Sequence, residues 1–250
     1  MWCEDQETVF YINELLDKAG SKVKLATFDL DYTIIKTKSG KKFPVDSNDW
    51  EFLNNVITKI TTYKEKGYLV AIFTNQSKLK DPANVVAFKE KIENIVEALG
   101  GNIQVYISKT SGYYRKPQRG MWDKMLSINN IDKISSKSFY CGDAAGRVKD
   151  WKKNVKKDFA CTDRMFANNV GVKFKTPEYV FEAEPETDKW EYKSIALDNY
   201  LTTDDDISRY ESLSNEEQEI VLMCGYPGVG KSIFCKKYFS QYEVVNQDLL

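Results

Sequence analysis

The stretch Lys24-Leu25-Ala26-Thr27-Phe28-Asp29-Leu30-Asp31-Tyr32-Thr33 runs from an apolar segment directly into two alternating aspartates. Its apolar part, residues 24–30, predicts a buried β-strand. Two carboxylates at alternate positions where a strand ends can both face one site once the backbone kinks, so one can act as a nucleophile and the other as a proton shuttle. The alternative is an aspartate-rich turn that merely ends the strand.

Strand-like and helix-like segments alternate along the chain from this point. The predicted strands are residues 24–30, 68–74, 103–108 and 138–142, and the predicted helices are residues 50–67, 82–99 and 120–128. This alternation predicts an α/β fold with a doubly wound, Rossmann-like parallel sheet. Because ligands bind at the carboxyl ends of parallel strands, we expect Asp29, Asp31, Thr74 and Asp143 to line one crevice.

Three further motifs follow the aspartate pair. Thr74, within residues 72–76, offers a hydroxyl to a phosphate oxygen, although a helix N-cap would use the same residue. Lys116, within Tyr114-Arg115-Lys116-Pro117, is suited to neutralising a phosphoryl group, although a lysine in solvent is the simpler interpretation. Asp143 follows a glycine at a strand end, as a magnesium ligand does, although a plain strand-to-turn signal has the same form.

The composition restricts the chemistry. The chain has 250 residues, no histidine, 36 basic and 37 acidic residues. Without histidine, Ser-His-Asp and Cys-His catalysis, histidine phosphatases and His-ligated zinc are excluded, so acid–base work falls to Asp, Glu, Lys or Tyr. The five cysteines form no C-x-x-C pair, and Cys141 and Cys224 lie in apolar, strand-like runs. With no signal peptide or membrane-length apolar segment, we expect reduced thiols in a soluble protein of the nucleus or cytoplasm, the nucleus being favoured.

Taken together and in order, the four motifs resemble those of the haloacid dehalogenase-like phosphohydrolases. The resemblance narrows to the phosphatase domain of the polynucleotide kinase 3′-phosphatases, over residues 21–182. The stretches that carry it are residues 26–31, 39–44 with Asp49-Trp50, 72–76, 114–117 with 120–123, 142–147, and 157–167 with Asp158, Phe159, Cys161, Asp163 and Arg164.

The resemblance implies a role for each matched residue. Asp29 would attack phosphorus and form an aspartyl-phosphate, while Asp31 would protonate the departing sugar 3′-oxygen and later activate water. Thr74 and Lys116 would hold the phosphoryl oxygens, and Asp29, Asp143 and the backbone carbonyl of Asp31 would bind Mg²⁺. The implied activity is magnesium-dependent removal of 3′-phosphate from DNA ends in strand-break repair.

Two positions depart from the family pattern. Tyr32 replaces the glycine usual between the second aspartate and the threonine, and can narrow the entrance to the site. Residues 77–80, Ser-Lys-Leu-Lys, replace a glycine-rich loop, so we expect the handling of DNA ends to differ in detail.

A second motif lies near the C-terminus. Residues 225–232 fit the phosphate-binding pattern G-x-x-x-x-G-K-[ST] between a predicted strand, 219–224, and a predicted helix, 232–238, although a simple glycine-rich turn is the alternative. Residues 244–248 resemble the kinase strand whose aspartate deprotonates a 5′-hydroxyl, which makes Asp248 the candidate base. The expected ATP-binding residues are Gly225, Gly228, Gly230, Lys231 and Ser232.

We therefore expect four regions. They are an extension over residues 1–20, the phosphatase domain over 21–182, a polar linker over 183–218 and the beginning of a P-loop kinase domain over 219–250. The roughly thirty residues after the linker are too few for a phosphoryl-transfer domain, so 5′-hydroxyl kinase activity requires the chain to continue beyond Leu250. A fragment of a bifunctional protein and a short form with phosphatase activity only both fit.

The expected partners are DNA ends carrying a 3′-phosphate or a 5′-hydroxyl, bound by a monomer without membrane contact. Basic residues gather at 36–42, 115–119 and 149–157, each beside a motif loop, where they can contact DNA phosphates. One rival function is a small-molecule phosphatase for sugar or histidinol phosphates, but such enzymes often carry a Cys/His zinc loop and no P-loop. A non-catalytic DNA-end module is a second rival, and the presence of the complete set of site residues argues against it.

Overall fold

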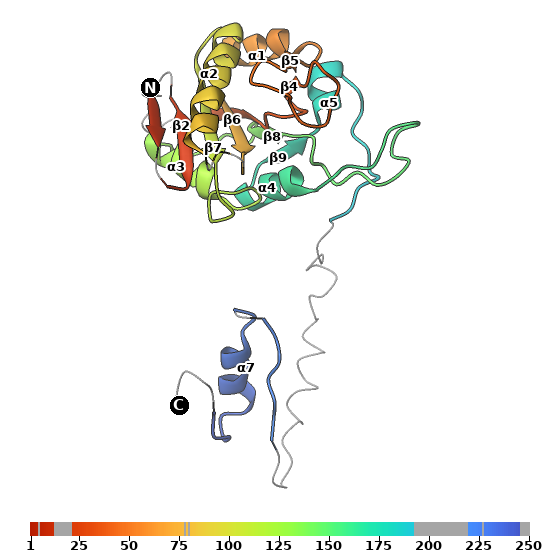
Figure 1. Ribbon diagram of the computed structural model, residues 1–250. Helices are drawn as coiled ribbons and strands as arrows, with labels where there is room; N and C mark the ends of the chain where they lie inside the picture. Colours follow the sequence, from red (N-terminus) through yellow and green to blue (C-terminus); the bar gives the residue numbers. More distant parts are fainter. Residues whose placement is uncertain are drawn as a thin grey trace. The chain divides into compact units, whose positions relative to one another are not determined.

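The predicted first strand is β3 (Lys24–Phe28), which lies inside a seven-stranded sheet of the computed structural model (Figure 1). The strand order is β1-β2-β7-β6-β3-β8-β9. From β7 to β9 neighbouring strands are parallel, whereas β2 is antiparallel to β7 and β1 is antiparallel to β2. The other strands of the sheet are β1 (Trp2–Glu4), β2 (Thr8–Tyr11), β6 (Tyr68–Asn75), β7 (Ile103–Ser108), β8 (Phe139–Cys141) and β9 (Lys173–Lys175).

The chain divides into two units, Met1–Ser194 and Ile195–Leu250, and the sheet belongs to the first. The structure describes residues 1–4, 6–12, 22–77, 79, 81–192, 220–226 and 228–245. Within these ranges, no helix is both long enough and apolar enough to cross a membrane.

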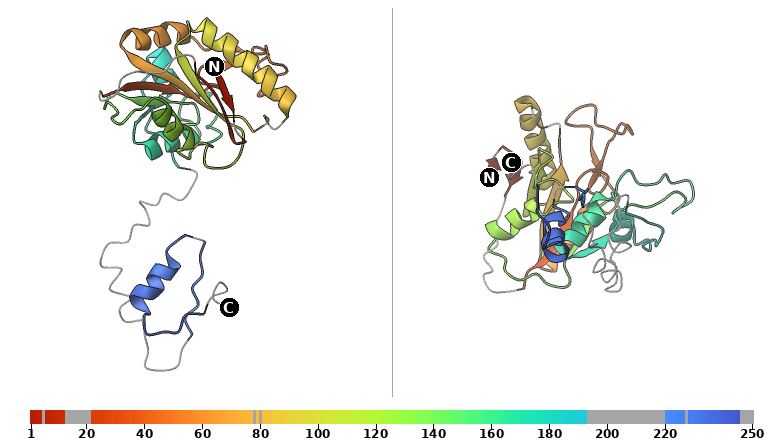
Figure 2. Two further views of the ribbon diagram at one scale, coloured as in Figure 1. Left: turned by 90° about the vertical axis from the view of Figure 1, so that its left-hand side faces the viewer. Right: turned by 90° about the horizontal axis from the view of Figure 1, so that it is seen from below.

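Helices cover both faces of the sheet (Figure 2). One face packs against α1 (Val56–Glu65), α2 (Pro82–Ala98) and α5 (Pro177–Glu182), and the other packs against α3 (Gly120–Ile128) and α4 (Thr162–Val170). Alternate residues of β3 serve the two cores, since Ala26 and Phe28 pack on the first face and Leu25 on the second. Burial on both faces explains why the parallel strands are apolar throughout.

β3 comes first in the chain among the parallel strands and has a parallel neighbour on each side. Later strands are added as β6 and then β7 on one side, and as β8 and then β9 on the other. Phe28 at the end of β3 pairs with Ile72 of β6 and Cys141 of β8, and the Asp29 backbone N–H donates to the Cys141 carbonyl at 2.8 Å. A crevice is expected outside the carboxyl ends of such strands, where the connections leave in opposite directions.

The sequence predicted the four strands β3, β6, β7 and β8 and the helices near α1, α2 and α3, but not β1, β2, β9, α4 or α5. All four predicted strands, and the helices α2 and α3, are confirmed to within two residues. The predicted helix 50–67 is wrong before Val56, because Glu51–Phe52 forms β5 and pairs with β4 (Ile35–Lys36). The Leu53 backbone N–H also donates to the Ile34 carbonyl at 3.1 Å, so this segment is committed to the β4–β5 pair and not to a helix.

The N-terminal residues, assigned by sequence to an extension, supply β1 and β2 at the edge of the sheet. Glu4 at the end of β1 accepts hydrogen bonds from Lys89 of α2 at 2.7 Å and from Lys109 after β7 at 3.0 Å. These ion pairs attach β1 to α2 and to the segment that follows β7.

Residues 183–192, assigned by sequence to a linker, contact the first unit. Trp190 forms an isolated bridge with Arg147, and the Glu186 carboxylate accepts from the Thr176 backbone N–H at 2.7 Å. The remainder of the predicted linker, residues 193–218, lies outside the described residues.

The second unit contains α7 (Lys231–Tyr238), close to the predicted helix 232–238. The predicted strand 219–224 is wrong over residues 220–224, which form no strand and leave Ile220 96% exposed. A strand needs a neighbour for its backbone N–H and C=O groups, and no described residue pairs with this segment. Cys224 is accordingly exposed, whereas Cys141 is buried in β8, and all five cysteines are free thiols.

Candidate active site

The carboxyl ends of three parallel strands bring the predicted phosphatase residues together. Asp29 follows β3, Thr74 lies at the end of β6, and Asp143 follows β8. Lys116 comes from the loop between β7 and α3, and its ammonium group donates to Asp29 Oδ1 at 2.5 Å. Together with Asp31, these residues line one open cavity of about 670 Å³.

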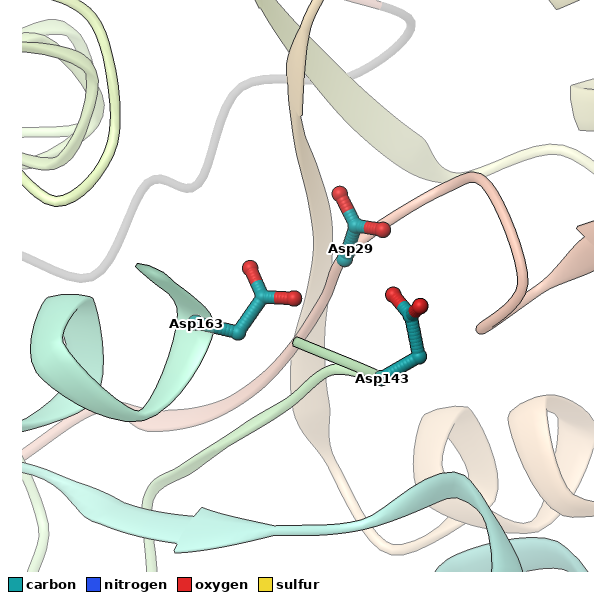
Figure 3. A group of neighbouring side chains, drawn as sticks. All are labelled: Asp29, Asp143 and Asp163. Carbon is teal, nitrogen blue, oxygen red and sulfur yellow. The ribbon is translucent and has the colours of Figure 1, made fainter. Parts of the chain in front are cut away.

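Asp163, at the first turn of α4, completes this group (Figure 3). Its Oδ1 accepts from the Lys116 ammonium at 2.8 Å and from the Tyr140 hydroxyl at 3.0 Å, while its Oδ2 accepts from the Ala144 backbone N–H at 3.0 Å. With its oxygens engaged by three donors and only 2% of the residue exposed, Asp163 anchors Lys116.

Sequence reasoning gave Asp163 no role, although the stretch that carries the family resemblance includes it. The sequence feature connected with Asp163 is Gly142, the residue before Asp143. A Cβ atom on Gly142 would lie 2.4 Å from the carboxyl carbon of Asp163, so the residue before Asp143 must be a glycine for the two elements to meet.

Asp31 and Thr74 are joined by a residue that the sequence did not single out. The Gln76 side-chain amide donates to Asp31 Oδ2 at 2.7 Å and to the Thr74 hydroxyl oxygen at 3.0 Å. Asp31 is partly exposed to the cavity, unlike the buried Asp29. The two aspartates of the motif therefore meet different surroundings, as separate nucleophilic and proton-transfer roles require.

Two further contacts fix the motif loops to one another. The Thr33 hydroxyl accepts from the Asp143 backbone N–H at 3.1 Å, which ties the loop after β3 to the loop after β8. Asn75 makes a reciprocal pair with Lys116, because its side-chain amide donates to the Lys116 carbonyl at 3.1 Å and its side-chain oxygen accepts from the Lys116 N–H at 3.0 Å. The lysine loop is thus held against the end of β6.

Tyr32 occupies the position at which the family pattern has glycine. Its backbone has a φ of 58°, the left-handed conformation that glycine adopts without steric cost. The Tyr32 hydroxyl donates a hydrogen bond to the Lys42 carbonyl at 2.7 Å, which offsets part of that steric cost. Tyr32 lines the cavity, so its side chain contributes to the wall.

The mouth of the cavity combines aromatic rings with basic groups. Phe43 and Phe159 are 60% and 86% exposed, and the Lys42 ammonium lies 5.5 Å from the first ring centroid and 4.6 Å from the second. Lys36 and Arg115 also line the cavity. This combination suits a ligand that carries both flat rings and phosphates.

The site holds more negative charge than Lys116 balances. Burial raises the pKa of Asp29 to about 7, with the carboxylates of Asp163 and Asp31 adding to the effect and Lys116 opposing it. Burial and the charges of Asp29 and Asp163 raise the pKa of Asp143 well above its usual range. Burial lowers the pKa of Lys116, but Asp163 and Asp29 more than reverse this, so it remains an ammonium group.

This imbalance fits a divalent cation. One carboxylate oxygen from each of Asp29, Asp143 and Asp163 lies within 4.8 Å of the others (Figure 3). Because the oxygens of Asp163 already accept from Lys116 and two other donors, Asp29 and Asp143 are the carboxylates left for a metal ion. Carboxylate oxygens are the ligands that Mg²⁺ prefers in proteins, so these residues fit the expected ion.

In the glycine-rich turn of the second unit, two glycines have left-handed backbone angles. Gly228 and Gly230 have φ values of 82° and 91°, which favour glycine. The Lys231 ammonium donates to the carbonyls of Gly225 at 2.7 Å and Tyr226 at 2.9 Å.

Of the two other predicted kinase residues, Ser232 and Asp248, the structure describes only the first. Ser232 is exposed in the first turn of α7. The candidate base Asp248 lies outside the described residues.

Comparisons with known proteins identify relatives of the chain. A bifunctional polynucleotide phosphatase/kinase of Schizosaccharomyces pombe is 36% identical over 231 residues, covering 91% of this chain and 54% of that protein. A putative bifunctional polynucleotide phosphatase/kinase of Acanthamoeba polyphaga mimivirus is 31% identical over 279 residues, covering 99% of this chain and 64% of that protein. The polynucleotide 3′-phosphatase ZDP of Arabidopsis thaliana is 34% identical over 193 residues, covering 70% and 26%. The chain thus spans less than two thirds of each of these relatives.

A family model described as polynucleotide kinase 3 phosphatase matches residues 24–181. This range begins at β3 and ends within α5, so it contains every residue of the carboxylate and lysine group. The chain belongs to the polynucleotide kinase 3 phosphatase family.

Proposed function

We propose that the chain hydrolyses the phosphate monoester at the 3′ end of a polynucleotide. The observation that carries the proposal is the contact of Asp29 with Lys116 beside Asp143, at the carboxyl ends of parallel strands and open to the cavity. A carboxylate next to a fixed ammonium group can attack phosphorus while the ammonium stabilises the transferring oxygens. Membership of the family supports a 3′-terminal phosphate as the group removed.

The first half of the reaction transfers the phosphoryl group to the protein. A carboxylate oxygen of Asp29 forms a bond to phosphorus, and the bond from phosphorus to the sugar 3′-oxygen breaks. Asp31 gives its proton to that oxygen, which leaves as a 3′-hydroxyl. Thr74 and Lys116 hold the phosphoryl oxygens during the transfer.

The second half restores the enzyme. Asp31, now a carboxylate, takes a proton from a water molecule that attacks phosphorus. The bond from phosphorus to Asp29 breaks, inorganic phosphate leaves, and both aspartates return to their starting protonation states. The hydrogen bond from Gln76 keeps the Asp31 carboxyl group oriented in both steps.

Asp29, Asp143 and the backbone carbonyl of Asp31 would hold Mg²⁺ in this proposal. The ion supplies positive charge that offsets the repulsion between the nucleophile and the phosphate. Asp163 is not included in this set, because its oxygens accept hydrogen bonds from Lys116, Tyr140 and Ala144.

The mouth of the cavity supports a nucleic acid as the substrate. The exposed rings of Phe43 and Phe159 can stack on bases, and Lys36, Lys42 and Arg115 can contact backbone phosphates. A substrate without bases or backbone phosphates would leave these groups unused. DNA ends are therefore the proposed partners, and strand-break repair is the process that such an activity serves.

The experiment compares phosphate release from a 3′-phosphorylated oligodeoxynucleotide, its 5′-phosphorylated isomer and a sugar phosphate. We expect release from the 3′-phosphate alone, loss of activity with EDTA, and recovery with added Mg²⁺. Equal or faster release from the sugar phosphate would favour the small-molecule phosphatase function. Activity that persists in EDTA would contradict the metal assignment.

We further propose that residues 225–248 belong to a nucleotide-dependent 5′-hydroxyl kinase portion, as the names of the two bifunctional relatives suggest. The glycine-rich turn and Lys231 support ATP binding by their residue pattern. In the described residues no strand precedes this turn, although a strand normally comes before a P-loop.

A further inference from the structure

Lys91 is a buried cation in the cavity that the proposed reaction does not use. It lies on α2, where Asn84, Ala87, Phe88 and Lys91 recur at helical spacing and line the cavity together. Only 6% of the residue is exposed, which is rare for a lysine without a partner.

No hydrogen-bonding or ion-pairing oxygen accompanies its ammonium group among the residues that the structure describes. Its nearest ring contact is Phe88, 5.8 Å from the ammonium nitrogen to the ring centroid. Burial lowers the pKa of Lys91, and the charges of Asp31 and Asp49 offset this only in part. Lys91 lines the cavity, and a charge with so little exposure to solvent and no counter-ion among the described residues is costly, so the position favours binding of an anion.

The location of Lys91 indicates which anion it would meet. The carboxylates whose charges raise the pKa of Lys91 are Asp31 and Asp49. Lys116, by contrast, forms ion pairs with Asp29 and Asp163. Asp31, the proposed acid for the sugar 3′-oxygen, lines the same cavity as Lys91 and Asp49. This shared cavity favours the side of the leaving nucleotide for Lys91. The anion that a polynucleotide carries on that side is the phosphodiester preceding its terminal nucleotide.

We propose that Lys91 binds this penultimate phosphodiester and so makes the enzyme prefer polynucleotides to nucleoside 3′-monophosphates. The inference rests on the proposed 3′-phosphatase function and adds to it a second phosphate subsite. Lys91 is a substrate-binding residue here and takes no part in bond making or breaking. One ammonium group matches the single negative charge of a phosphodiester.

The test uses three substrates and two variants of the full chain. The substrates are thymidine 3′-monophosphate, the 3′-phosphorylated thymidine dinucleotide, and the same dinucleotide with an uncharged methylphosphonate linkage. Lys91→Met removes the charge and keeps a long apolar side chain. Lys89→Met is the matched control, since Lys89 lies on the same helix but pairs with Glu4 outside the cavity.

We expect Lys91→Met to lower kcat/KM for the dinucleotide by about tenfold to a hundredfold and to leave the mononucleotide within about twofold. The methylphosphonate should lower wild-type kcat/KM by a similar factor and cause no additional loss in Lys91→Met. Lys89→Met should behave as wild type on all three substrates.

Equal losses on mononucleotide and dinucleotide would overturn the inference, because Lys91 would then act on the transferred phosphate. Undiminished wild-type activity on the methylphosphonate would also overturn it, and this measurement needs no folded variant. If wild-type protein hydrolysed none of the substrates, the proposed 3′-phosphatase function would fail and the subsite with it. Hydrolysis of the mononucleotide therefore separates the two failures.

Discussion

Asp29 is the proposed nucleophile and must be ionised to react, yet its carboxylate is buried beside other carboxylates. Lys116 supplies part of the balancing charge at 2.5 Å, and Asp143 offers a second ligand for a cation. The same crowding that raises the pKa of Asp29 therefore creates a place for a divalent ion.

Asp29→Asn should abolish phosphate release from a 3′-phosphorylated oligonucleotide, by about a thousandfold or more, because the amide cannot attack phosphorus. Oligonucleotide binding, measured by fluorescence anisotropy, should persist, because the aromatic and basic residues at the mouth of the cavity are unchanged. Near-normal turnover by this variant would refute the assignment of the nucleophile.

Asp163 should matter for rate through Lys116. Asp163→Asn keeps the shape of the side chain but removes the charge that holds the ammonium group, so we expect kcat to fall by about tenfold to a hundredfold with little change in KM. Asp123→Asn is the control, because Asp123 lies in the first turn of another helix and pairs only with exposed partners. Wild-type kcat in Asp163→Asn would show that Lys116 does not depend on this anchor.

The connection between β8 and α4 carries Asp143, the basic residues 149–157 and Phe159 on one long segment. Arg147 fastens it, because its guanidinium donates to both oxygens of Asp158, at 3.1 and 2.9 Å, and to Glu178 of α5 at 2.8 Å. Arg147 also donates to the Asp143 carbonyl at 3.3 Å, so the same side chain contacts the proposed metal ligand.

Arg147→Met should lower the free energy of unfolding by about 3 kcal/mol, because it leaves the buried Asp158 carboxylate without its charged partner. Urea denaturation followed by circular dichroism would measure this. Arg119→Met, which removes an exposed ion pair, should cost less than about 1 kcal/mol. Equal stability of the two variants would show that the Arg147 network does not hold the segment.

The first unit contains the seven-stranded sheet and the candidate site, whereas the described residues of the second unit form one short helix. The first unit buries both faces of its sheet, whereas Ile220, Leu222 and Tyr226 before α7 are largely exposed. The described structure therefore supports the proposed phosphatase activity more strongly than the proposed kinase activity.

A protein of these 250 residues should transfer no detectable γ-phosphate from ATP to a 5′-hydroxyl oligonucleotide, while it removes 3′-phosphate. The physical reason is that the described residues before the glycine-rich turn form no strand to orient Lys231 toward a nucleotide, and its ammonium group donates to the Gly225 carbonyl. Radiolabelled ATP and a 5′-hydroxyl, 3′-phosphate oligonucleotide would test both activities in one reaction. Labelled product would contradict the prediction.

The sequence by itself determined the four strands β3, β6, β7 and β8, the doubly wound α/β class and the motif residues at the strand ends. These depend on patterns within short contiguous segments, such as the apolar run before Asp29, where local periodicity and burial agree. It also predicted the glycine-rich turn, whose φ values depend on local backbone freedom.

Only the tertiary structure decided which distant side chains meet. Asp163 contacts Lys116 across 47 residues, and Lys91 lines the cavity while neighbouring residues of α2 pack into the core. The β4–β5 pair likewise replaced a predicted helical turn, and residues 220–224 remained without a strand partner. The reason is common to all four cases, since each outcome depends on a partner remote in the chain or on the lack of one, and periodicity carries no information about that.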